Sequence, residues 1–232
     1  MKRVFRNNKI FLVPYILILL AIFPFFLLYS KTEIHLWINS HNSPFADGFF
    51  SVITWLGDGF VVFFAGVAVL LFSFRKGLLV LSSYLLSGLL VQVLKRFIFT
   101  DSLRPYSFFD GKAELHLIKG VEMLGSRSFP SGHSASAFAF FLSLAMMTSR
   151  NTIKIICLVS ATAVAYSRVY LSQHFLSDIY LGSVIGVASA LAVYWFLSIK
   201  DRSWYELSVI SLFKSRSSSL KNNHAGHQGN YK

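Results

Sequence analysis

Charged residues and cysteine are both scarce in this chain of 232 residues. Asp, Glu, Lys and Arg make up 14% of the sequence, whereas they make up about 25% of a typical soluble domain. The single cysteine, Cys157, excludes an intramolecular disulfide, and its apolar neighbours favour a packing role. No group of Cys and His has the spacing of a zinc site. The sequence therefore excludes a disulfide-rich secreted module and a zinc-binding fold.

Apolar residues are correspondingly abundant. They account for 54% of the chain, with 24 Phe and a mean hydropathy of +0.57. This composition indicates a polytopic membrane protein, which we expect to form one domain over residues 1–213. Residues 214–232 are rich in Ser, Lys, Asn and His, which predicts a disordered basic tail in the cytoplasm.

Six apolar segments are candidates for transmembrane helices, since about 20 apolar residues cross a bilayer. We therefore predict an all-α bundle of six transmembrane helices. The second, fourth and fifth segments are short and need flanking residues to span. The segments are Ile10–Tyr29, 60–74, Leu78–Leu94, Ser134–Met147, Ile155–Tyr166 and Ile179–Ile199.

Lys and Arg distribute unequally between the two ends of such a bundle. With the N-terminus inside, 14 of the 22 cations and two of the 10 carboxylates lie on the cytoplasmic face, and the remaining charges balance outside. Cytoplasmic loops of membrane proteins carry this excess. We expect both termini in the cytoplasm of a bacterium and the protein in its inner membrane. The net charge of +12 then needs no nucleic-acid partner, and no basic stretch interleaved with stacking aromatics suggests one.

Two long segments lie on the outer face in this topology. Residues 31–59 mix aromatic and polar side chains, which predicts an amphipathic stretch in the membrane interface. Residues 106–129 mix apolar and charged side chains. They either rest on lipid headgroups and help admit a lipid tail or form an ordinary connection.

Three polar stretches coincide with the outer ends of the apolar segments. They hold Lys95 and Arg104, then Ser131-Gly132-His133, then Arg168 with His174 and Asp178. Cations at span ends often only anchor a helix, and a lone His or Asp often only forms a hydrogen bond or a cap. That two histidines fall in polar clusters on one side favours a functional site, on the periplasmic face.

The chemistry of these residues suits a phosphate ester. His174 and Asp178 are four residues apart and share a helix face, so the carboxylate can hold Nδ1 and leave Nε2 to attack. Gly132 permits close approach of backbone N–H groups to an anion at a helix start. Lys95, Arg104 and Arg168 can neutralise phosphoryl oxygens as charge shifts in the transition state.

The stretches resemble the motifs of the type 2 phosphatidic acid phosphatase superfamily. P-S-G-H matches at 130–133, and S-R-x-x-x-x-x-H-x-x-x-D matches from Ser167 to Asp178. The first motif, K-x-x-x-x-x-x-R-P, departs from the pattern, because eight residues and not six separate Lys95 from Arg104. Either the loop is longer by two residues, which we favour, or another cation such as Arg96 takes the role of the lysine.

The resemblance implies a role for each residue. His174 is the nucleophile and forms a phosphohistidine, Asp178 orients it, and His133 protonates the leaving group and then activates water. The phosphate is bound by Lys95, Arg104, Ser131, Gly132 and Arg168. The resemblance implies no metal and no other cofactor.

The substrate implied is a lipid phosphate. Phosphatidylglycerol phosphate, phosphatidic acid, undecaprenyl diphosphate and a lipid A phosphate all fit an outward-facing site. A lipid-to-lipid phosphotransferase with the same site is the alternative activity. A haloperoxidase is disfavoured because those relatives are soluble, and a transporter because the charges cluster at one interface and not at the midplane. The oligomeric state does not follow from the sequence.

Overall fold

The computed structural model describes residues 2–199, 205 and 207–209, and this part of the chain contains helices and no strand. The predicted all-α fold is confirmed. The predicted tail, 214–232, lies outside the described residues.

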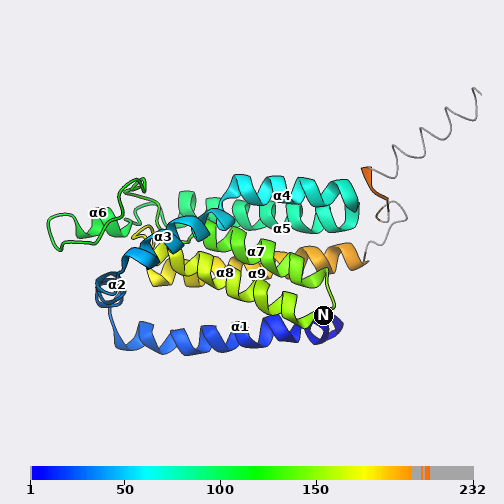
Figure 1. The fold of residues 1–232 in the computed structure, drawn as a ribbon, viewed down its shortest axis with the longest axis horizontal. Coiled ribbons are helices and arrows are strands. Elements are labelled where there is room, and N and C mark those ends of the chain that lie inside the picture. Colours follow the sequence, from blue (N-terminus) through cyan, green and yellow to red (C-terminus); the bar gives the residue numbers. More distant parts are fainter. Residues whose placement is uncertain (1, 200–204, 206, 210–232) are drawn as a thin grey trace, which may run out of the picture.

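All six predicted apolar segments are helical, and they pack side by side as a bundle (Figure 1). The chain enters α1 and leaves α9 at the same end of this bundle (Figure 1). The fifth helix is longer at both ends than the predicted 155–166. The helices are α1 (Lys2–Leu28), α4 (Gly59–Phe72), α5 (Phe74–Val93), α7 (Gly132–Met146), α8 (Asn151–Tyr170) and α9 (Leu176–Ile199).

Four of these helices are long and apolar enough to cross a membrane: Val4–Leu28, Phe74–Ile98, α8 and α9. A fifth candidate is a pair, Pro44–Gly57 and Gly59–Phe72, whose two parts bend by 52°. The helix α7 has only 15 residues. The described residues thus hold four to five candidate spans, and six spans with cytoplasmic termini remain a prediction.

Short helices cover the end of the bundle opposite the N-terminus (Figure 1). They begin at recognisable caps: Ser30 and Glu33 form a capping box for α2, and Ser43 caps α3 ahead of Pro44. Between α6 and α7 the chain has no regular structure. These elements are α2 (Lys31–Ser40), α3 (Pro44–Ile53), η1 (Thr54–Gly57), η2 (Leu94–Ile98) and α6 (Pro105–Phe109).

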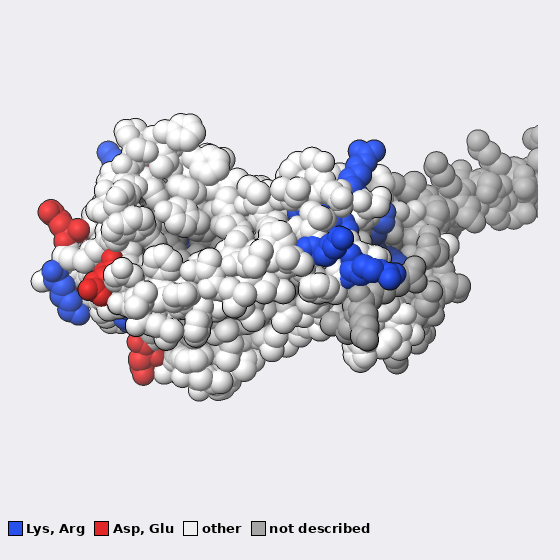
Figure 2. Space-filling model, turned by 90° about the horizontal axis from the view of Figure 1, so that it is seen from below, with Lys and Arg blue, Asp and Glu red and all other residues white. Residues whose placement is uncertain are grey.

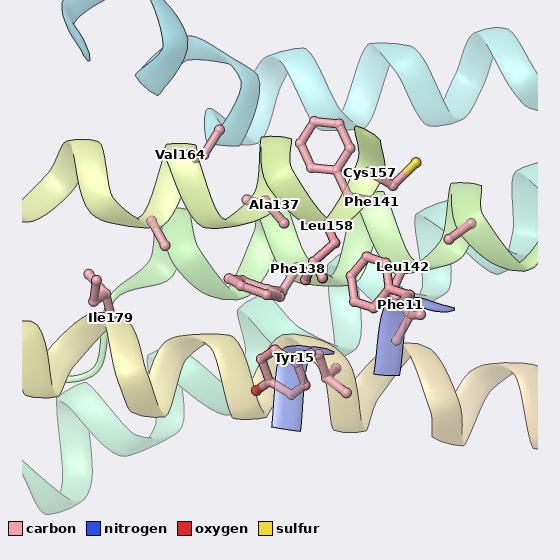
Figure 3. Packing of buried hydrophobic residues seen from close by; sticks show 14 of the residues in the cluster. Phe11, Tyr15, Ala137, Phe138, Phe141, Leu142, Cys157, Leu158, Val164 and Ile179 are labelled. Carbon is pink, nitrogen blue, oxygen red and sulfur yellow. The ribbon is translucent and has the colours of Figure 1, made fainter. Parts of the chain in front are cut away.

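The helix α7 lies at the centre of the core and contacts α5, α8 and α9 (Figures 1 and 3). Its small residues permit this close packing, since Ala137 and Ala139 are fully buried. On α9, a Cβ at Gly186 would collide with the backbone of α7. Phe138 and Leu142 fill the layer between α7 and α1, against Phe11 and Tyr15 (Figure 3). Cys157 belongs to the same cluster, as its predicted packing role requires.

The two ends of the bundle differ in charge. In the face shown in Figure 2, the visible described charges are Lys and Arg at the end near the N-terminus, and both signs at the opposite end. Arg6, Lys9, Lys76 and Arg150 are exposed at the ends of their helices. This asymmetry agrees with the predicted orientation, which remains a prediction.

Candidate active site

The structure brings the three polar stretches to the end of the bundle covered by the short helices. Lys95 lies in η2 and Arg104 precedes α6, while Arg168 lies in the last turn of α8. All three cations are buried, as are Ser131, His174 and Asp178. The electrostatic environment of His133 includes Arg168, His174, Arg104 and Lys95, which shows that residues distant in sequence share one site.

His174 and Asp178 form the pair that their spacing predicts. The Nδ1 atom of His174 lies 3.2 Å from Oδ2 of Asp178. The same oxygen accepts hydrogen bonds from the hydroxyl of Ser128 and from the backbone N–H of Phe175, at 3.1 Å. A carboxylate held by several donors fixes the ring orientation and leaves Nε2 for an incoming phosphorus.

The turn before His174 is held by α2. Ser172 has a φ of 53°, in the left-handed region that non-glycine residues seldom occupy. Its hydroxyl lies 3.2 Å from Nε2 of His35 and accepts a hydrogen bond of 3.2 Å from Asn39. The ring of His35 is buried between Phe109 and Phe175. Residues of α2 thereby stabilise the loop that presents His174.

Two arginines contribute their guanidinium groups to the site in different ways. Arg104 donates to the backbone oxygens of Ser126 and Gln173, at 3.1 and 3.2 Å, and to the side chain of Gln173 at 3.1 Å. Arg168 donates from Nη1 to the hydroxyl of Thr54 at 2.8 Å. Among the described residues its Nε is buried and has no hydrogen-bond partner. A buried donor without a partner is costly, so an anion at this point would satisfy it.

The geometry favours Lys95 over Arg96 as the cation of the first motif. Lys95 is buried, with Nζ donating to the backbone oxygen of Arg127 at 2.8 Å, whereas Arg96 is exposed. The residues Leu94–Ile98 form a π-helical turn. A π turn takes more residues than an α turn, so it accommodates part of the extra length before Arg104.

Ser131 connects the second motif to the third. Its hydroxyl caps α7 by accepting from the backbone N–H of Ser134 at 3.3 Å, and its own N–H donates to the backbone oxygen of Asp178 at 2.9 Å. The N–H of Ser131 is therefore already used. Gly132 and His133 follow in the first turn of α7, where helical N–H groups lack intrahelical partners. An anion can be bound there.

A cavity of about 520 Å³ opens beside His133 and Arg168. Its other walls come from η1 and the start of α4, through Thr54, Trp55 and Asp58, and from Gln173 and residues 119–124. A second cavity, of about 430 Å³, adjoins Asp178 from the side of Phe99 and Phe129. His133 is the one catalytic candidate whose side chain keeps substantial exposure, 32%.

Burial also affects the charge states of groups outside the candidate membrane-spanning helices. It lowers the pKa of His174 to about 3, against the opposing effect of Asp178, and lowers the pKa of Arg104. His174 is therefore neutral at physiological pH, which is the form in which an imidazole can act as a nucleophile. His35 is likewise neutral, because burial lowers its pKa to about 4.

Several residues at the site were missed by the sequence analysis. Ser128 contacts both His174 and Asp178, and the hydroxyl of Thr54 accepts a hydrogen bond from Arg168. Asp58 lies 4.0 Å from the Nε2 of His133. Asp58 stands out as a carboxylate between two apolar stretches, which is a signal for a functional group. For Ser128 and Thr54 the sequence offers no such signal.

The family model of the PAP2 superfamily matches residues 76–202, more than half of the chain. The chain belongs to the PAP2 superfamily. The resemblance drawn from the motifs is confirmed. No curated protein matches the chain. Among the described residues of this PAP2 protein, no group of three or more His, Cys, Asp and Glu is placed to hold a metal ion.

Two solved structures of PAP2-type proteins resemble the chain in fold and sequence. LpxE of Aquifex aeolicus is 29% identical with a TM-score of 0.63, and the match covers 71% of this chain and 94% of that one. A transmembrane PAP2-type phosphatidylglycerolphosphate phosphatase of Bacillus subtilis is 25% identical with a TM-score of 0.60, covering 86% and 99%.

Proposed function

We propose that this PAP2 protein is an integral-membrane phosphatase that hydrolyses a phosphomonoester or diphosphate of a lipid through a phosphohistidine at His174. The observation that carries the proposal is the pairing of His174 with Asp178 beside the buried Nε of Arg168, which has no hydrogen-bond partner among the described residues. A neutral imidazole held at Nδ1 is a nucleophile, and a free guanidinium donor is a phosphate ligand.

The reaction proceeds in two steps. Nε2 of His174 attacks phosphorus, and the P–O bond to the lipid breaks while His133 transfers its proton to the leaving oxygen. The neutral His133 then accepts a proton from water as that water attacks phosphorus. The P–N bond breaks, inorganic phosphate leaves, and both histidines return to their starting forms.

The cations bind the phosphoryl oxygens throughout. We assign this role to Lys95, Arg104 and Arg168 with the first turn of α7 at Ser131 and Gly132. Phosphate-ester hydrolysis without a catalyst is among the slowest reactions known, so several positioned charges suit the size of the barrier.

The lipid class follows from the setting of the site. The bundle has apolar outer surfaces, and its charge asymmetry supports an active site on the periplasmic face of the inner membrane. The similarity to a phosphatidylglycerolphosphate phosphatase also supports a lipid substrate. We propose six spans, with α4 and α7 completed by flanking residues.

Phosphate release from purified protein in detergent tests the proposal. Phosphatidylglycerol phosphate, phosphatidic acid, undecaprenyl diphosphate and a lipid A phosphate are each supplied in the presence of EDTA. We expect release from at least one of them without added magnesium. Absence of release from all four, or complete dependence on a divalent cation, would contradict the proposal.

A further inference from the structure

The segment between α3 and α4, residues 54–58, is fixed against the site although it lies outside the family match. The hydroxyl of Ser136 donates to the backbone oxygen of Gly57 at 2.6 Å. A Cβ at Gly57 would collide with Val164 and press on the backbone oxygen of His133, so only glycine permits this approach. Thr54 accepts the hydrogen bond from Arg168. The segment is thus tied to both α7 and α8.

Asp58 divides its two carboxylate oxygens between two tasks. Oδ1 accepts the N–H of Phe60 at 2.8 Å and caps α4, which fixes the orientation of the group. Oδ2 faces His133, at 4.0 Å from Nε2. Both side chains border the cavity of about 520 Å³, so a substrate in that cavity can reach His133.

The motif residues whose charges act on His133 are cations or a neutral imidazole. All four oppose a positive charge on His133: Arg168 from α8, Arg104 from the loop before α6, Lys95 from η2, and His174. Lys119 and Glu122 border the same cavity from the loop before α7, and Tyr84 of α5 interacts with Asp58. Asp58 is the carboxylate for which a contact with His133 is observed.

We infer that Asp58 is a positioning residue that acts through His133: its charge stabilises the protonated form, so that the Nε2–H is available to the leaving oxygen. This inference rests on the proposed phosphatase function and deepens it. An opposite charge at this distance favours the imidazolium, which must be present when the lipid oxygen departs. After proton transfer the neutral His133 faces the cavity, where the attacking water enters.

Two substrates with different leaving groups test the inference. Phosphatidic acid releases an alkoxide that needs a proton, whereas p-nitrophenyl phosphate releases a stable phenolate that does not. In Asp58→Asn the amide still caps α4, since Asn and Asp cap helices about equally. We expect kcat for phosphatidic acid to fall by about 10- to 100-fold, with KM nearly unchanged, and kcat for p-nitrophenyl phosphate to stay within about threefold.

The pH profile gives a second readout. Because the charge of Asp58 supports protonation of His133, the alkaline limb of kcat for phosphatidic acid should move to lower pH in Asp58→Asn.

Asp58→Glu, which keeps the charge, should recover part of the activity. Asp110→Asn makes the same chemical change at an exposed site on the covered end of the bundle and should leave both substrates unaffected. Asp58→Ser, which also caps, replaces Asp58→Asn if the latter does not fold.

Equal losses with both substrates would show that Asp58 only supports the fold, and no loss with either would show that His133 does not depend on it. Either result overturns the inference while wild-type hydrolysis upholds the phosphatase. Failure of the wild-type protein to release phosphate from any of the four lipids would instead contradict the proposed function.

Discussion

The two histidines of the site occupy opposite environments. The side chain of His174 is 2% exposed and is held by Asp178, Ser128 and a turn that α2 supports, whereas the side chain of His133 is 32% exposed and faces a cavity. The difference matches two chemical tasks. A nucleophile gains from a fixed orientation, and a proton donor must meet first the departing lipid and then water.

The supports of the two histidines also come from different parts of the chain. Asp178 and Ser128 belong to the region matched by the family, residues 76–202, whereas Asp58 and His35 precede it. The first 75 residues therefore do more than anchor the bundle, since α2 supports the loop of His174 and the start of α4 contacts His133.

Removing each histidine is the strongest way to test this contrast. We expect His174→Ala to abolish phosphate release from both phosphatidic acid and p-nitrophenyl phosphate, because no nucleophile remains. His133→Ala should abolish release from the lipid but retain measurable release from the aryl ester, a difference of about 100-fold or more. Expression and membrane insertion should persist in both variants. Full activity in purified His174→Ala would refute its role.

Ser128→Ala tests the buried surroundings of His174 alone. The variant removes a hydroxyl that donates to Asp178 and contacts His174. The loss of one buried hydrogen bond to a charged group, about 1.5–3 kcal/mol, should lower kcat by about 10- to 150-fold for both substrates alike. Ser126→Ala, at an exposed serine of the same loop, is the control. A loss confined to phosphatidic acid would show that Ser128 affects proton donation by His133 instead.

His35→Phe should have the smallest effect and concerns stability. His35 and His174 have folded-state pKa values of about 4 and 3, below the unfolded value of about 6.5. Between these pKa values the unfolded chain binds more protons than the folded chain. The free energy of unfolding is therefore highest above about pH 6.5 and falls as the pH drops toward 4. His35→Phe removes one of the two contributions.

Thermal unfolding in detergent between neutral pH and pH 4 measures this effect. We expect the midpoint of the wild-type protein to fall with acidification and that of His35→Phe to fall less steeply. At neutral pH the variant should be slightly less stable, by about 1 kcal/mol, because Ser172 loses its contact with the ring. Parallel slopes would show that burial does not keep His35 neutral.

The sequence was sufficient for the helices and for the pairing of motif residues. Apolar length predicts the six helices, and a separation of four residues places His174 and Asp178 on one helix face. It was insufficient where tertiary contacts decide the structure. The π turn at Leu94–Ile98, the left-handed Ser172 and the 52° bend before α4 each lie where the chain forms hydrogen bonds with residues distant in sequence.

Asp58 and Ser128 show the same limit within the site. Neither belongs to the quoted motifs, and each contacts the site only because α4 and the loop before α7 fold against it. The number of membrane spans depends on helix length and not on contacts within the site. The helix α7 is shorter than a bilayer requires, so its length alone does not decide whether it crosses.

The stereochemical course at phosphorus tests the central claim most directly. The thiophosphate analogue of phosphatidic acid, made chiral at phosphorus by two oxygen isotopes beside the sulfur, is hydrolysed by the wild-type protein in water that carries the third oxygen isotope. Two successive in-line displacements, first by His174 and then by water, predict retention of configuration in the inorganic thiophosphate released. Inversion would mean that water attacks the lipid phosphate directly, and it would contradict a phosphohistidine intermediate.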